Sequence, residues 1–141
     1  MLRYVRADNT EIHEVEGLFV GPQFETDVWV TDAVLESLQK LLQKKDRVRF
    51  LEKVKYFATG GFRKFESDNG PIKSEGNHVY RVSQGMNSLF RLIGFYEGAK
   101  IEFIGIIAFR KRGRKLSAPQ RAKILKVAKV KQQGTWKKKQ A

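Results

Sequence analysis

The sequence contains no cysteine and only two histidines, His13 and His78. The lack of cysteine rules out disulfides and thiolate metal sites, and two histidines are too few for a histidine-rich metal site. Residues 1–15 contain no apolar segment of the kind found in signal peptides. No run of the chain approaches the roughly 20 apolar residues that span a bilayer. These absences predict a cytoplasmic protein that uses no metal and no small-molecule cofactor and does not bind a membrane.

Acidic side chains are absent from residues 110–141, which contain thirteen lysines and arginines. The formal net charge of the whole chain is +13, whereas residues 1–30 contain six acidic and only two basic side chains. The excess positive charge therefore lies in the last segment. Such a block is typical of proteins that bind a polyanion: nucleic acid, the ribosome, an anionic membrane or an acidic protein. The other interpretation is a solvated basic tail that keeps the protein soluble.

Ten phenylalanines and a hydrophobic fraction of 41% indicate a folded chain of one domain. Residues 101–109 are apolar on both alternating faces, as in a fully buried central strand. Two further strands are predicted before it, over residues 78–84 and 89–96, with turns at 85–88 and 97–100. The sequence thus predicts three consecutive antiparallel strands.

Two amphipathic helices are predicted upstream, over residues 32–43 and 47–58. Thr31 or Asp32 is a typical N-cap for the first, and Gly60-Gly61 is a typical stop for the second. Residues 62–77 are predicted as a loop, and a basic helix is predicted over residues 118–131. Before all of these, residues 2–7 and 12–20 resemble a hairpin.

The predicted fold class is α+β: an antiparallel sheet of about four strands, an N-terminal α-hairpin on one face, and a basic C-terminal helix. The other sheet face is left for a ligand. We divide the chain into an acidic N-terminal hairpin extension (residues 1–22), a main domain (23–131) and a basic disordered tail (132–141).

The segment HVYRV, then LFRLIGFYEG, then KIEFIGIIAFRKRGRKLS resembles the RelE/HigB toxin superfamily, and most closely its phage-associated HigB-like branch. Its members have a strand that ends in arginine, an aromatic strand with an internal arginine, and an apolar strand that closes on several cations. The matching residues here are Arg81, Phe90-Arg91-Leu92, Phe95-Tyr96, Phe109-Arg110-Lys111 and Lys115. The similarity covers roughly residues 24–131. Relatives often have a histidine where this chain has Ile107.

The resemblance implies a RelE-like fold and an endoribonuclease that cleaves mRNA, on the ribosome or free of it. It also implies a toxin whose partner is a cognate antitoxin protein. Such cleavage is metal-free: the 2′-OH is deprotonated, the charge on the phosphorus is stabilised, and the leaving oxygen takes a proton. The alternative is a non-catalytic nucleic-acid-binding or protein-interaction module of the same fold, with a phage origin as one option.

Arg91 interrupts an otherwise apolar strand, and a buried arginine is rare unless it is paired. One interpretation is a structural ion pair with Glu97 or Glu102. The other is a phosphate-binding arginine, because a guanidinium group matches phosphate oxygens in a bidentate way.

Arg81 is the expected companion of Arg91, and their relation depends on the turn between the two strands. A three-residue loop at 85–87 puts Arg81 directly opposite Arg91, on the same face. A two-residue loop, Met86-Asn87, sends the two arginines to opposite faces. The sequence leaves both open.

Lys111 and Lys115 are the candidate bases or phosphate ligands, since neighbouring cations lower the pKa of a lysine. Tyr96 is a candidate proton donor or a core residue. The predicted catalytic residues are Arg81, Arg91, Lys111, Lys115 and Tyr96. The predicted nucleic-acid-binding residues are Arg110, Arg112, Arg114, Arg121, Lys123 and Lys126.

Overall fold

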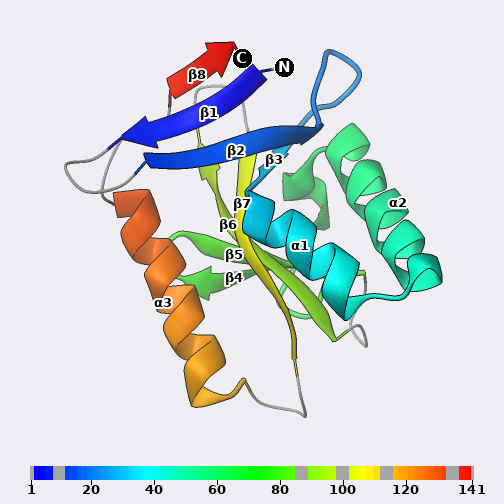
Figure 1. The fold of residues 1–141 in the computed structure, drawn as a ribbon. Coiled ribbons are helices and arrows are strands. Elements are labelled where there is room, and N and C mark those ends of the chain that lie inside the picture. The colour runs from blue at the N-terminus through cyan, green and yellow to red at the C-terminus, as the bar shows by residue number, and fades with distance from the viewer. Residues whose placement is uncertain are drawn as a thin grey trace.

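A computed structural model describes residues 2–7, 12–84, 89–97, 102–111, 116–132 and 137–140. These residues form one mixed sheet of eight strands in the order β4-β5-β6-β7-β3-β2-β1-β8, with helices on both faces (Figure 1). In chain order the elements are β1 (Leu2–Ala7), β2 (Ile12–Phe19), β3 (Asp27–Val30), α1 (Asp32–Leu41), α2 (Lys44–Gly60), the 3-10 helix η1 (Phe62–Phe65), β4 (Ile72–Gly76), β5 (Val79–Val82), β6 (Phe90–Glu97), β7 (Glu102–Arg110), α3 (Ala118–Gln132) and β8 (Lys137–Gln140).

The predicted antiparallel sheet of about four strands is wrong in both size and type. β7 has β6 as its antiparallel neighbour on one side and β3 as a parallel neighbour on the other. A strand that is apolar on both faces is buried within a sheet, with a neighbour on each side. The short segment before α1 supplies the second neighbour, and Thr31 extends it: its backbone N–H donates to the Gly105 carbonyl and its hydroxyl to the Ile106 carbonyl.

The predicted α-hairpin is also wrong. Helix α1 packs mainly along β7, and only Leu42 and Gln43 separate it from α2. Thr31 caps α1 as predicted, because its Oγ1 accepts from the Val34 backbone N–H at 3.3 Å. Residues 44–46, which we expected to end the first helix, instead form the first turn of α2.

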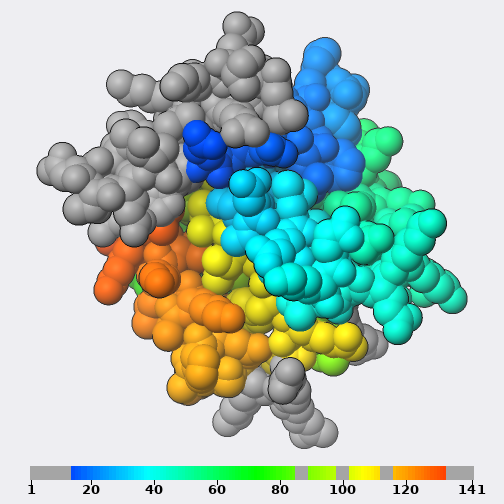
Figure 2. Space-filling view, in the orientation of Figure 1, coloured from blue at the N-terminus to red at the C-terminus, as the bar shows by residue number. Residues whose placement is uncertain are grey.

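The two sheet faces carry separate hydrophobic clusters. The first lies under α1 and α2 and includes Phe62, Leu92 and Phe103. The second lies under α3 and includes Trp29, Ile93 and Phe95. Figure 2 shows atoms of β7 between α1 on one side and α3 on the other. The face that we expected to be open for a ligand is therefore covered in part by α3.

Residues 62–77, predicted as a loop, contain η1 and strand β4. β4 pairs with β5 through a tight turn in which Asn77 and His78 both have positive φ angles, 55° and 63°. Two consecutive positive φ angles are typical of a two-residue type I′ hairpin loop. This hairpin adds β4 as the strand at one end of the sheet.

The N-terminal strands β1 and β2 pair with each other, and β2 pairs with β3, so residues 2–7 and 12–19 belong to the same sheet. Lys137–Gln140, which we expected in a disordered tail, pairs with β1 as strand β8. The division at residues 22 and 131 stays a prediction. In the part of the chain that the structure describes, no helix is both long and apolar enough to cross a membrane.

Candidate functional site

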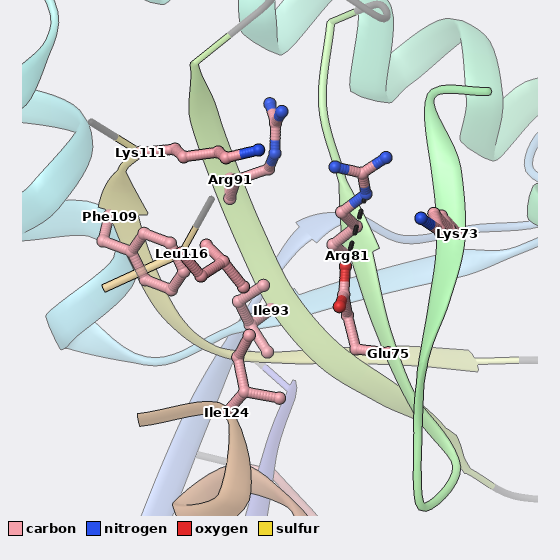
Figure 3. A pocket seen from close by; sticks show the side chains of 9 residues that line it. All are labelled: Lys73, Glu75, Arg81, Arg91, Ile93, Phe109, Lys111, Leu116 and Ile124. Atoms are coloured by element: carbon pink, nitrogen blue, oxygen red, sulfur yellow. Dashed lines mark ion pairs between the residues drawn. The ribbon is translucent and has the colours of Figure 1, made fainter. Parts of the chain in front are cut away.

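Three of the predicted catalytic cations lie together on the α3 face of the sheet. Arg81 comes from β5, Arg91 from β6, and Lys111 follows the last residue of β7; all three line a hollow of about 170 Å³ (Figure 3). Lys73 and Glu75 of β4 line the same hollow. Four cations and one carboxylate from four segments of the chain thus surround one small space, which we call the cationic pocket.

The register between β5 and β6 is neither of the two that the sequence left open. Arg81 lies opposite Ile93, and Arg91 is two residues from Ile93 along the same strand. Since side chains alternate along a strand, Arg81 and Arg91 share a face but are diagonal rather than direct neighbours. The turn residues 85–88, on which our two alternatives depended, lie outside the described residues.

Arg91 is buried, with only 4% of its surface exposed. Its Nη1 donates to the Phe90 carbonyl at 3.4 Å. Burial lowers the pKa of Arg91, and the positive charge of Arg81 lowers it further. The ion pair with Glu97 or Glu102 that we considered is not formed. These two residues lie opposite each other in the register of β6 and β7, at the far end of the strands and about 20 Å from Arg91.

Lys73 and Glu75 are the site residues that the sequence analysis missed. Lys73 lies directly opposite Arg81, and Glu75 Oε1 is 3.4 Å from Arg81 Nε in an ion pair that is mostly shielded from solvent. A signal for this strand was present in the sequence. Gly76-Asn77, a pair typical of hairpin turns, separates residues 72–75 from the strand predicted over residues 78–84.

Lys111 is held at the mouth of the pocket by its backbone, since its N–H donates to the Leu89 carbonyl at 2.7 Å. Desolvation by burial lowers the pKa of Lys111, and the charges of Arg91 and then Arg81 lower it further. The direction agrees with our expectation that neighbouring cations make this lysine a readier proton donor or base.

Tyr96 does not join the pocket, because it lies on the opposite face of β6, against the α1 and α2 cluster. Its hydroxyl donates to Glu66 Oε1 at 2.5 Å, its ring contacts Tyr80 with ring centroids 4.8 Å apart, and Arg63 lies over it at 5.0 Å. Burial and the contact with Glu66 raise the pKa of Tyr96. The geometry favours the core role over the proton-donor role.

The predicted nucleic-acid-binding residues are spread more widely. Arg110 is exposed at the end of β7, and Arg121, Lys123 and Lys126 are exposed on α3. Lys115, Arg112 and Arg114 lie outside the described residues. Within the described ranges, no group of three or more acidic, histidine or cysteine side chains is placed to hold a metal ion.

Comparisons of the chain with protein-family models, curated proteins and solved structures found no match. The resemblance to the RelE/HigB superfamily therefore rests on the residues quoted above.

Proposed function

We propose that this protein is an endoribonuclease that binds an RNA phosphate in the cationic pocket and cleaves the chain there. The observation that supports this proposal best is the convergence of Lys73, Arg81, Arg91 and Lys111 around one hollow that also contains a carboxylate. Three of these cations come from positions that the resemblance to the RelE/HigB toxins singles out. By that resemblance, the substrate is mRNA, cleaved on the ribosome or free of it, and the partner is an antitoxin protein.

The pocket has the electrostatics of an anion site. Burial, and after it the repulsion between like charges, lowers the pKa of both Arg91 and Lys111. A bound phosphate relieves that repulsion, and guanidinium groups bind its oxygens in a bidentate way. The same charges stabilise the extra negative charge on phosphorus in the transition state.

The pocket also contains groups for both proton transfers. In our proposal, Glu75 takes the proton of the 2′-OH while the 2′ oxygen attacks phosphorus, and the bond from phosphorus to the 5′ oxygen breaks. Lys111, whose pKa is lowered, gives its proton to that leaving 5′ oxygen. The products are a 2′,3′-cyclic phosphate and a free 5′-hydroxyl. Arg81 and Arg91 hold the phosphate throughout.

The test uses the purified full-length protein and a labelled RNA, with and without ribosomes. We expect the wild type to yield fragments with cyclic phosphate ends, and Glu75→Gln and Lys111→Ala each to reduce the rate at least 100-fold. The matched control is Lys45→Ala, which removes one exposed lysine from α2 on the other side of the sheet. Intact RNA after incubation with wild type under both conditions would rule out the nuclease proposal.

A cellular experiment tests the toxin part of the proposal. Induced expression of the wild type should arrest growth and create clustered new 5′ ends in mRNA, and neither effect should appear with Lys111→Ala. Co-expression of the cognate antitoxin, which would be sought in a small gene beside this one, should restore growth. Normal growth with unchanged 5′ ends on wild-type expression would contradict a toxin.

A second candidate is an RNA-binding protein without cleavage activity. It is favoured by the position of Tyr96, which faces away from the pocket, and by Ile107 at a position where relatives often have histidine. This candidate predicts that RNA binding weakens with salt, by about 0.7 log units of affinity per log unit of salt for each phosphate bound. Binding with that dependence but without any cleaved product would select it.

A further inference from the structure

The cationic pocket has a second half that the proposed chemistry does not use. Ile93, Phe109, Leu116 and Ile124 line it on the side toward α3, away from Lys73 and Glu75 (Figure 3). Ile93, Phe109 and Ile124 belong to the buried cluster under α3, and Leu116 packs against that cluster while staying partly exposed. An apolar wall thus borders the cations directly.

The size of the hollow limits what this apolar half can take. Its volume of about 170 Å³ is close to that of a cavity of about 150 Å³ that binds benzene, and well below the range of roughly 300–1,000 Å³ for drug-sized ligands. This is the volume of the whole hollow, the part beside the cations included, so a base whose phosphate lies on the cations has to share it, and a single six-membered ring fits there more easily than the two fused rings of a purine.

Hydrogen bonds hold the wall in place. The Gln120 side chain donates from Nε2 to the Arg110 carbonyl at 2.9 Å and accepts from the Ser117 backbone N–H at 3.2 Å. The Gln120 backbone N–H in turn donates to Ser117 Oγ at 3.3 Å. These bonds tie the start of α3, next to Leu116, to the end of β7.

We propose that the apolar half is a base-binding subsite that takes one pyrimidine of a single-stranded RNA while the adjoining phosphate lies on the cations. This inference rests on the proposed function, since it adds a base to the phosphate that the cations bind. Unpaired bases of single-stranded RNA are splayed out and bind between apolar or aromatic side chains. Leu116 limits the size of the base that can enter, because it is the one apolar residue of the wall that is partly exposed to the hollow's opening.

The experiment measures binding of oligouridylate, oligocytidylate and oligoadenylate of equal length at one salt concentration. All three carry 2′-O-methyl groups, so that the protein cannot cleave them. We expect the wild type to bind both pyrimidine oligomers about tenfold more tightly than oligoadenylate. Equal affinities, or a preference for oligoadenylate, would overturn the subsite. No binding of any oligomer would overturn the proposed function together with the subsite.

Two substitutions of Leu116 then test the wall. Leu116→Ala enlarges the hollow and should reduce the pyrimidine preference to less than about threefold by improving oligoadenylate binding. Leu116→Trp fills the hollow and should remove the preference by weakening pyrimidine binding alone. The matched control is Leu125→Ala on α3, whose side chain is 55% exposed and does not line the pocket. A preference that persists in both Leu116 variants would overturn the assignment.

Discussion

Strand β6 separates two surfaces of different chemistry. On its α1 and α2 side, Leu92 and Tyr96 belong to a cluster rich in aromatic rings, in which Phe62 and Phe103 have ring centroids 5.0 Å apart. On its α3 side, Ile93 and Phe95 are fully buried, whereas Arg91 precedes them on the same face and lines the cationic pocket. The face toward α1 and α2 is filled by packed side chains. The face toward α3 is packed around Ile93 and Phe95 and charged at Arg91.

The difference shows how one strand serves both stability and function. Aromatic rings packed on one face contribute burial that does not depend on ligands. On the other face, burial and then the charge of the neighbouring Arg81 lower the pKa of Arg91, so both oppose its charged form. Substitutions on the two faces should therefore have opposite profiles: loss of stability on the first and loss of RNA binding on the second.

The largest effect is expected from Phe103→Ala on the α1 and α2 side. Phe103 is completely buried, and its ring contacts both Phe62 and Tyr96. Removing it should lower the free energy of unfolding by about 3–5 kcal/mol, measured by urea denaturation. Tyr56→Ala is the control, because Tyr56 is 60% exposed and should cost far less. Equal losses for the two variants would contradict the packing described for this face.

Arg91→Met tests the charged side of the same strand. Replacing the guanidinium group by an apolar side chain should weaken RNA binding roughly 10- to 100-fold, the size expected for lost hydrogen bonds to a charged group. The free energy of unfolding should change by less than about 1 kcal/mol, because the repulsion from Arg81 and Lys111 is also removed.

Arg49→Met, at an exposed position of α2, is the matched control for Arg91→Met and should leave both quantities unchanged. If Arg91→Met unfolded the protein, Arg91 would be a structural residue. If it bound RNA as tightly as wild type, Arg91 would lie outside the phosphate site.

Tyr96→Phe distinguishes the core role of this tyrosine from a catalytic one. The change removes the hydrogen bond to Glu66, so we expect a loss of about 1–2 kcal/mol in the free energy of unfolding. RNA cleavage and RNA binding should stay within twofold of wild type, because Tyr96 faces away from the pocket. A selective loss of cleavage with normal binding would instead place Tyr96 in the catalytic machinery.

The smallest effect is an alkaline dependence of stability that also comes from Tyr96. Its pKa is raised in the folded state, whereas in the unfolded chain tyrosine loses its proton near pH 10. Above that pH the unfolded state binds fewer protons than the folded state, so the stability that Tyr96 contributes is present below pH 10 and is lost as the pH rises further. Urea denaturation at pH 8 and above pH 10 should show a shallower fall for Tyr96→Phe than for wild type. Identical slopes would contradict the raised pKa.

Local patterns predicted several parts of this molecule correctly. The period of apolar residues located α1, and nearly continuous apolar runs located strands β6 and β7, since these signals depend on a side chain's own neighbours along the chain. The interruption of an apolar strand singled out Arg91, and the charged end of the next strand singled out Lys111. Both line the pocket.

The failures share one physical cause, which is that they concern contacts between segments distant in the chain. Turn residues flank β4, so we predicted a loop there. Because β4 was missed, its residues Lys73 and Glu75 were missed as well. The register of β5 on β6, and with it the relation of Arg81 to Arg91, depended on a turn that admitted more than one length.

Composition and local spacing alone determined that this chain folds, where most of its helices and central strands lie, and that its positive charge collects after residue 109. These properties follow from each residue's intrinsic preferences. Only the tertiary structure decided that β3 pairs in parallel with β7, that α1 and α2 cover one face and α3 the other, and that Lys73 and Glu75 complete the cationic pocket. Those outcomes depend on burial of the whole sheet, because β7 needs a neighbour on each side and a helix on each face, and no stretch of sequence specifies them by itself.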